Sequence, residues 1–121
     1  MKKSILIIED EHNIAQAQAL ILEDKFNVHH ALDGEEGLKK AQKIKPDLII
    51  LDLMLPKIDG YKVCRLLKFD EKYKNIPVIM LTARAQESDK KLGLDVGADA
   101  YIVKPFEPDV LLSKIKELLK E

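Results

Sequence analysis

The chain has 121 residues, of which 46% are hydrophobic and 34% charged, and this length and composition predict one domain with a buried core. Twenty basic residues against 21 acidic ones give a net charge of −1, which argues against direct nucleic-acid binding. No apolar run is long enough to span a membrane or form a signal peptide, and the lone Cys64 cannot form an internal disulfide. We therefore expect a soluble, cytoplasmic domain.

Five short apolar runs recur at roughly even spacing and predict five strands. Four of them do not alternate with polar residues, which is typical of strands buried on both faces of a parallel sheet. The runs are Ile5–Ile8, Val28–Ala31, Leu48–Leu51, Val78–Leu81 and Tyr101–Val103. Because His29 and His30 interrupt the second run, we expect that strand at an edge of the sheet, with the two imidazoles on opposite faces.

Helical periodicity fills the stretches between these runs. Four apolar stripes predict four helices: Ile14, Ala17 and Ile21; Leu38, Ala41 and Ile44; Val63, Leu66 and Leu67; Leu111, Ile115 and Leu118. Asp33 with Glu36 resembles a capping box at the start of the second helix, and Asp59 is the predicted N-cap of the third.

The stretch Gln86–Asp95 predicts a further helix, the weakest of the five. It contains Gly93, which costs about 1 kcal/mol of helix stability relative to alanine. It offers only Leu92 and Leu94 as large apolar residues. A helix with so few anchors needs only a small difference in free energy to change its position.

Strand and helix thus alternate five times along the chain. This alternation predicts an α/β fold, because right-handed crossovers place helices on both faces of a parallel sheet. Five strands suit a doubly wound, flavodoxin-like sheet of order 2-1-3-4-5 better than a barrel, which needs eight. We see no repeat or linker, so residues 1–121 are expected to form one domain.

Chemically active side chains follow four of the predicted strands. They are Glu9, Asp10 and Glu11 after the first strand, Asp52 after the third, Thr82 at the end of the fourth and Lys104 after the fifth. The carboxyl ends of parallel strands meet at one edge, where such sheets bind ligands. Neighbouring carboxylates repel unless they are protonated or bridged by a cation, and oxygen ligands suit Mg²⁺. An ammonium opposite them could neutralise a phosphoryl group, and a carboxylate can form an acyl phosphate.

Four motifs in this order resemble the receiver domain of two-component response regulators, from end to end of the chain. They are Glu9-Asp10-Glu11 after ILII, LIILDLMLPKIDG at 48–60, PVIMLTA at 77–83 and GADAYIVKPF at 97–106. The resemblance implies a signalling phosphoacceptor rather than an enzyme. A histidine kinase or phosphotransfer protein would phosphorylate the domain in a reaction that needs Mg²⁺ or another divalent ion such as Mn²⁺. The phosphorylated domain would then change conformation and regulate a partner or an output domain.

The resemblance also implies how the phosphoacceptor and its metal are held. Asp52 would accept the phosphoryl group. Asp10, Asp52 and the backbone carbonyl of Met54 would bind the metal ion, and Glu9 would act on it, through water.

The remaining site residues are assigned by the same resemblance. Thr82 would hydrogen-bond the phosphoryl group and Lys104 would pair with it, so that both act with Asp52 in the reaction. Tyr101 would turn between exposed and inward rotamers as part of a switch with Thr82. Pro105 would follow a cis peptide bond that aims Lys104 at the site.

Two other classes of protein share part of this pattern. A flavodoxin has the same strand order, but the three carboxylates after the first strand would repel the phosphate of its cofactor. A phosphatase of the haloacid dehalogenase type also uses an aspartate nucleophile, but it needs a second acid two residues later, where Met54 stands. An absorbance scan for flavin and a screen of small phosphate monoesters distinguish these classes from a receiver.

The pattern leaves open whether the regulator is free-standing or the receiver of a longer protein. Its last 25 residues or so resemble receivers that dimerise on phosphorylation through the fourth helix, fifth strand and fifth helix. That face usually carries two acids and an arginine where this chain has Ala100, Val110 and Lys114. These departures argue against that dimer and favour a free-standing regulator, with the receiver of a longer protein as the alternative.

Overall fold

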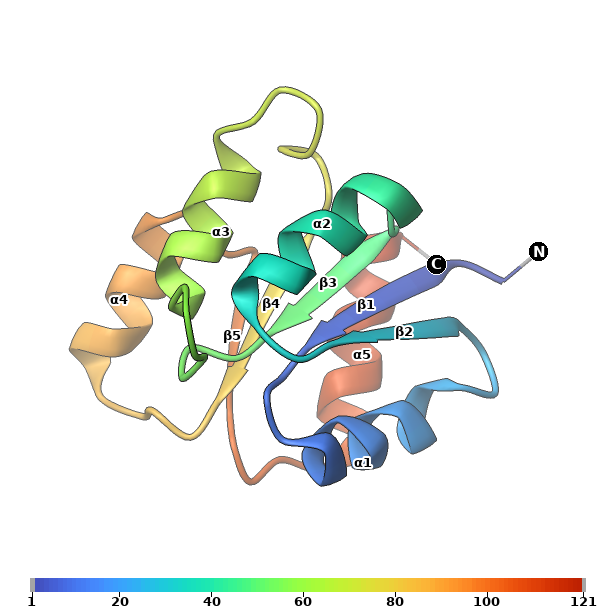
Figure 1. Cartoon of the computed structure of the whole chain (residues 1–121). Coiled ribbons are helices and arrows are strands. Elements are labelled where there is room, and N and C mark those ends of the chain that lie inside the picture. Colours follow the sequence, from blue (N-terminus) through green and yellow to red (C-terminus); the bar gives the residue numbers. More distant parts are fainter. Residues whose placement is uncertain (1, 121) are drawn as a thin grey trace.

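The computed structural model describes residues 2–120 as an open parallel sheet between two layers of helices (Figure 1). The strands are β1 (Ser4–Ile8), β2 (Asn27–Ala31), β3 (Leu48–Leu51), β4 (Val78–Thr82) and β5 (Ala100–Val103), in the order β2-β1-β3-β4-β5. The helices are α1 (His12–Leu22), α2 (Gly34–Ile44), α3 (Gly60–Lys68), α4 (Glu87–Asp95) and α5 (Pro108–Leu119). The predicted fold class and strand order are confirmed.

The side chains of each strand alternate between two apolar cores. In β1, Ile5 and Ile7 pack with α1 and α5, whereas Leu6 and Ile8 pack with α2 and α3. Figure 1 shows α1 and α5 on one face of the sheet and α2, α3 and α4 on the other. Among residues 2–120, no helix has the length and apolar character needed to cross a membrane.

Side-chain caps fix where two of the helices begin. The Asp33 carboxylate accepts a hydrogen bond of 2.8 Å from the Glu36 N–H, and Asp59 caps α3 by accepting one of 3.0 Å from the Lys62 N–H. Both predicted caps are confirmed. The Glu36 carboxylate reaches back to the N–H of Leu32, one residue before the cap, at 3.2 Å.

Two predicted helix stripes are wrong in detail. In α1 the buried residues are Ala15, Gln18 and Leu22, whereas the predicted Ala17 is exposed. Alanine, leucine and isoleucine lie on several sides of this helix, so periodicity alone does not identify its inward face. In α3 the predicted Leu66 is exposed, and Cys64 is buried beside Val63 and Leu67 in its place.

The strand β2 forms one edge of the sheet, as its histidines predict. It pairs with β1 through alternate residues: the Asn27 N–H donates to the Lys3 carbonyl, and the Ala31 carbonyl accepts from the Glu9 N–H. The backbone of His30 therefore faces outward. Its carbonyl accepts a hydrogen bond from the Lys40 ammonium of α2.

Candidate functional site

The register of the sheet brings the ends of β1 and β3 to the same level. Ile8 pairs with Leu51, and the Asp52 N–H donates to the Ile8 carbonyl at 3.2 Å. The next residues, Glu9 and Asp52, therefore leave neighbouring strands side by side. Both side chains are buried, with residue exposures of 2% and 9%. Two carboxylates thus meet at the carboxyl edge of the sheet.

The Lys104 ammonium lies between these two carboxylates. It is 3.0 Å from the Glu9 Oε1 and 3.1 Å from the Asp52 Oδ2. The backbone of Lys104 is tied to β4, because its N–H donates to the Thr82 carbonyl at 2.9 Å. The Lys104–Pro105 peptide bond is cis. The ends of β1, β3, β4 and β5 therefore build one charged pocket.

The three charged groups shift one another's pKa. Burial raises the pKa of Glu9 to about 7, although the Glu11 N–H and the Lys104 ammonium oppose the rise. Burial acts in the same direction on Asp52, but the Met54 N–H and Lys104 outweigh it and hold the Asp52 pKa below its ordinary value of 3.8. Burial lowers the pKa of Lys104, but its two carboxylate partners outweigh this and raise it. At neutral pH, Asp52 is therefore an anion beside a cation.

The third acid, Asp10, lies outside this ion-paired group. Its side chain is exposed, and no hydrogen bond or ion pair within residues 2–120 reaches it. No three histidine, cysteine, aspartate or glutamate side chains in that range are arranged to hold a metal ion by themselves. The atoms available to bind a metal here are oxygens, and two buried carboxylates share one lysine. A hard divalent cation fits this chemistry if water and backbone oxygens complete its coordination shell.

Thr82 and Tyr101 flank the pocket on β4 and β5. Thr82 is fully buried, and its Oγ1 accepts a hydrogen bond of 3.4 Å from the Arg84 N–H. The Tyr101 hydroxyl donates to the Arg84 carbonyl at 2.7 Å, so both residues hold the loop between β4 and α4. The Tyr101 ring packs closely over Gly93, where an added Cβ would lie 2.9 Å from a ring carbon. Burial raises the pKa of Tyr101 to about 12, and its hydroxyl stays protonated at neutral pH.

Sequence reasoning missed three residues that connect to this loop: Tyr61, Arg84 and Asp89. The Arg84 guanidinium pairs with the Asp89 carboxylate at 3.0 Å, and the Tyr61 hydroxyl lies 3.0 Å from the Asp89 carbonyl. The only sequence signal was an acid in the first turn of α4, which ordinarily complements the helix dipole. Their association depends on how α3 and α4 pack, which no local pattern encodes.

The doubly wound sheet, with two carboxylates and a lysine at its carboxyl edge, defines a class of domain that binds a phosphoryl group and acts as a switch. The family model for the response regulator receiver domain matches residues 5–116. The chain belongs to this family and is a receiver domain of a two-component system, a signalling switch. Receiver domains of this family are phosphorylated by histidine kinases.

Curated relatives and solved structures that are similar to this chain agree with this assignment. The alkaline phosphatase synthesis transcriptional regulatory protein PhoP of Bacillus subtilis is 46% identical over 99% of the chain and 50% of its own length. The signal receiver domain of a histidine kinase from Syntrophus aciditrophicus is 39% identical, with a TM-score of 0.91 over 98% of this chain and 90% of that one. Chemotaxis response regulator CheY4 of Vibrio cholerae is 34% identical, with a TM-score of 0.90 over 98% and 99%. The chain spans about half the length of the curated relatives it matches.

Proposed function

We propose that Asp52 is the phosphoacceptor of this receiver, and that residues 1–121 act as one phosphorylation-controlled switch. The observation that carries the proposal is the ion pair between the buried Asp52 carboxylate and Lys104 at 3.1 Å. It keeps Asp52 ionised, and a carboxylate nucleophile must be ionised to attack phosphorus. The domain assists its own phosphorylation and dephosphorylation, and it turns over no separate substrate.

The pocket's own groups would support each part of the transfer. An Asp52 oxygen forms the new O–P bond while the P–N bond of a phosphohistidine breaks, and the leaving imidazole takes up a proton. Lys104 would move from the carboxylates to the developing charge on the phosphoryl oxygens. The Thr82 hydroxyl lies at the end of the adjacent strand and can donate to one of those oxygens.

Acetyl phosphate with Mg²⁺ tests the acceptor directly. We expect one phosphate adduct in the intact mass of the wild-type protein and none in Asp52→Asn, which keeps the shape and removes the nucleophile. Asp24→Asn, in the exposed turn after α1, is the matched control and should be modified like wild type. A phosphate adduct on the Asp52→Asn protein would contradict the assignment.

A divalent ion would be held by Asp10, Asp52 and the Met54 backbone carbonyl, with Glu9 acting through water. Mg²⁺, or Mn²⁺ in its place, would supply positive charge to the transferring phosphoryl group. The exposed Asp10 carboxylate supports a ligand role because no other described group uses it. The Glu9 carboxylate is already engaged by Lys104 and by the Glu11 N–H, which favours an indirect role.

Calorimetric titration with Mg²⁺ separates these two roles. Loss of a direct ligand should weaken binding more than loss of a group that acts through water. We therefore expect a larger loss of affinity for Asp10→Asn than for Glu9→Gln. Equal affinities of the two variants would contradict the assignment.

Phosphorylation would act on α4 and Tyr101 through the loop after Thr82. A phosphoryl group that accepts a hydrogen bond from the Thr82 hydroxyl would draw that hydroxyl toward Asp52, and the loop whose Arg84 N–H donates to it would move as well. Hydrogen exchange with a beryllofluoride mimic on Asp52 should change the protection of residues 86–95 and of Tyr101, while α2, which lies outside the proposed output face, serves as the internal reference. Unchanged exchange in these segments, with the mimic bound, would leave a phosphoacceptor without this switch.

A histidine kinase or phosphotransfer protein would be the phosphoryl donor, and the face of α4, β5 and α5 would carry the output. Leu94 and Val110 are exposed on that face and could join a phosphorylation-dependent dimer, whereas Ala100 is buried. The transcriptional regulator among the relatives supports an output in gene expression, through a partner or a further domain. The one free, buried thiol of residues 2–120, Cys64, supports a cytoplasmic location.

A further inference from the structure

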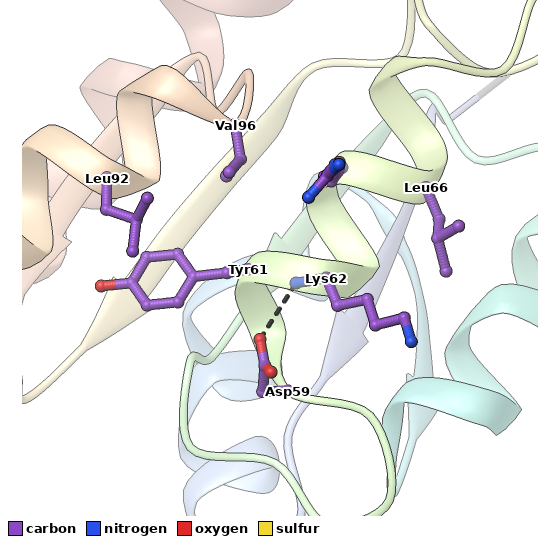
Figure 2. Close-up of a pocket in the computed structure, with 7 residues that line it drawn as sticks. Asp59, Tyr61, Lys62, Leu66, Leu92 and Val96 are labelled. Carbon is purple, nitrogen blue, oxygen red and sulfur yellow. Dashed lines mark hydrogen bonds between the residues drawn. The ribbon is translucent and has the colours of Figure 1, made fainter.

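A tyrosine on α3 reaches across to the first turn of α4. Figure 2 shows Tyr61 in the groove between these helices, with its ring turned toward Leu92 and Val96 of the α4 side. The groove encloses about 630 Å³. The Tyr61 hydroxyl lies 3.0 Å from the Asp89 carbonyl and 3.5 Å from the Asp89 carboxylate. Burial and the Asp89 charge raise the pKa of Tyr61, so this hydroxyl remains a hydrogen-bond donor.

Asp89 is the buried centre of this contact. Only 8% of the residue is exposed, and a buried carboxylate is costly without partners. Its partners are the Arg84 guanidinium at 3.0 Å and the more distant Tyr61 hydroxyl. The apolar residues Leu92 and Leu94 are exposed and do not anchor α4, so these polar contacts fix its first turn.

Arg84 connects this contact to the phosphoacceptor pocket. Its N–H donates to the Thr82 hydroxyl at 3.4 Å, and its carbonyl accepts from Tyr101 at 2.7 Å. Its guanidinium also lies 3.9 Å from the sulfur of Met54, two residues after the proposed acceptor. A displacement of Arg84 would therefore disturb both the β4–α4 loop and the hydrogen bond that this loop makes to the Thr82 hydroxyl.

We infer that Tyr61 is a positioning residue for the phosphoacceptor site: through Asp89 and Arg84 it fixes the β4–α4 loop, whose Arg84 N–H donates to the Thr82 hydroxyl at the end of β4. The inference rests on the proposed function of Asp52. Loss of the Tyr61 hydroxyl leaves Asp89 with fewer partners and loosens its hold on Arg84. Part of the binding free energy of a phosphoryl group is then used to order this loop, so the affinity for the phosphoryl group falls.

Beryllofluoride with Mg²⁺ is the probe, and its affinity is measured by calorimetric titration. We expect Tyr61→Phe to bind it about 5-fold more weakly than wild type, the low end of typical coupling between distant groups. Tyr73→Phe is the matched control, because Tyr73 packs against the same core without contacting Asp89 or Arg84, and it should bind like wild type. Urea unfolding of each variant measures stability separately from affinity.

A double-variant cycle tests whether the effect passes through Arg84. We expect Arg84→Ala to weaken beryllofluoride binding, and Tyr61→Phe to add almost nothing in that background, because the connection is already broken. Wild-type affinity in Tyr61→Phe, whatever its stability, would overturn the inference. So would independent, multiplicative effects in the double variant. Failure of the wild-type protein to bind beryllofluoride would instead overturn the proposed function, and this inference with it.

Discussion

The helices α4 and α5 lie on opposite faces of the same sheet but are attached to it in different ways (Figure 1). In α5, Leu111 and Ile115 are fully buried in the apolar core. In α4, the buried residues are Asp89 and Gly93, while Leu92 and Leu94 are each nearly half exposed. The contacts that hold α4 are therefore mostly hydrogen bonds and an ion pair.

The α4 side of the domain can move at a lower cost in free energy than the α5 side. Separation of an apolar interface exposes its whole area to water, at roughly 25 cal/mol per Å². A hydrogen bond or ion pair can exchange one partner for another, with a net cost near 1 kcal/mol. The fold thus places its exchangeable contacts beside the phosphoacceptor pocket and its permanent ones on the opposite face.

Truncation of an apolar side chain should destabilise the protein much more in α5 than in α4. We expect Leu111→Ala in α5 to lower the free energy of unfolding by about 2–5 kcal/mol, because it leaves a cavity in the core. The same truncation in α4, Leu92→Ala, should cost roughly 1 kcal/mol or less, since its side chain is already nearly half exposed. Urea denaturation measures both. Similar losses for the two variants would show that α4 is held by apolar packing after all.

A methyl group at Gly93 should show how closely α4 approaches the sheet. An added Cβ would lie 2.9 Å from the Met80 sulfur and from the Tyr101 ring. Alanine gains about 1 kcal/mol in helix propensity, but overpacking costs typically about 1–3 kcal/mol. We expect Gly93→Ala to destabilise the protein by about 1 kcal/mol and to displace Tyr101 from the Arg84 carbonyl. An increase in stability on urea denaturation would mean that the helix can move aside freely.

The stability of the folded protein should depend on pH through Glu9. The pKa of Glu9 is about 7 in the folded protein and 4.5 ordinarily, so between these pH values the folded state binds more protons. The free energy of unfolding should therefore fall as pH rises through this window, by roughly 3 kcal/mol, and level off above it. Glu9→Gln should remove the slope; a persistent slope would assign it to another group.

Hydrogen exchange over the same pH range sharpens this test, once the intrinsic pH dependence of exchange is removed. Amides of α5 near Ile115 should follow the fall in global stability, because their exchange requires unfolding of the core. Amides of α4 should exchange through local opening and follow it much less. If amide exchange in α4 and α5 changed with pH to the same extent, α4 would not open independently of the core.

The sheet and the charged pocket could be predicted from sequence because each is encoded locally. Apolar runs mark the strands, and the rule that parallel strands share a carboxyl edge then places Asp52 and Lys104 together. The inward face of α1 could not be predicted, since alanine, leucine and isoleucine lie on several sides of that helix and the polar Gln18 is buried. Tyr61 and Asp89 are 28 residues apart in the sequence and lie on different helices. Their contact depends on how α3 and α4 pack, so no local signal could indicate it.

The outward-facing backbone of β2 has a consequence for how copies of this domain meet. An edge strand offers unpaired backbone groups to which a strand of another molecule can add, and this is a common start of aggregation. Here the Lys40 ammonium donates a hydrogen bond to the outward-facing His30 carbonyl and places a positive charge on the edge. An incoming strand would have to displace that ammonium before it could form its first hydrogen bond there. A charge on a neighbouring helix thus opposes the addition of a further strand at this position of the edge.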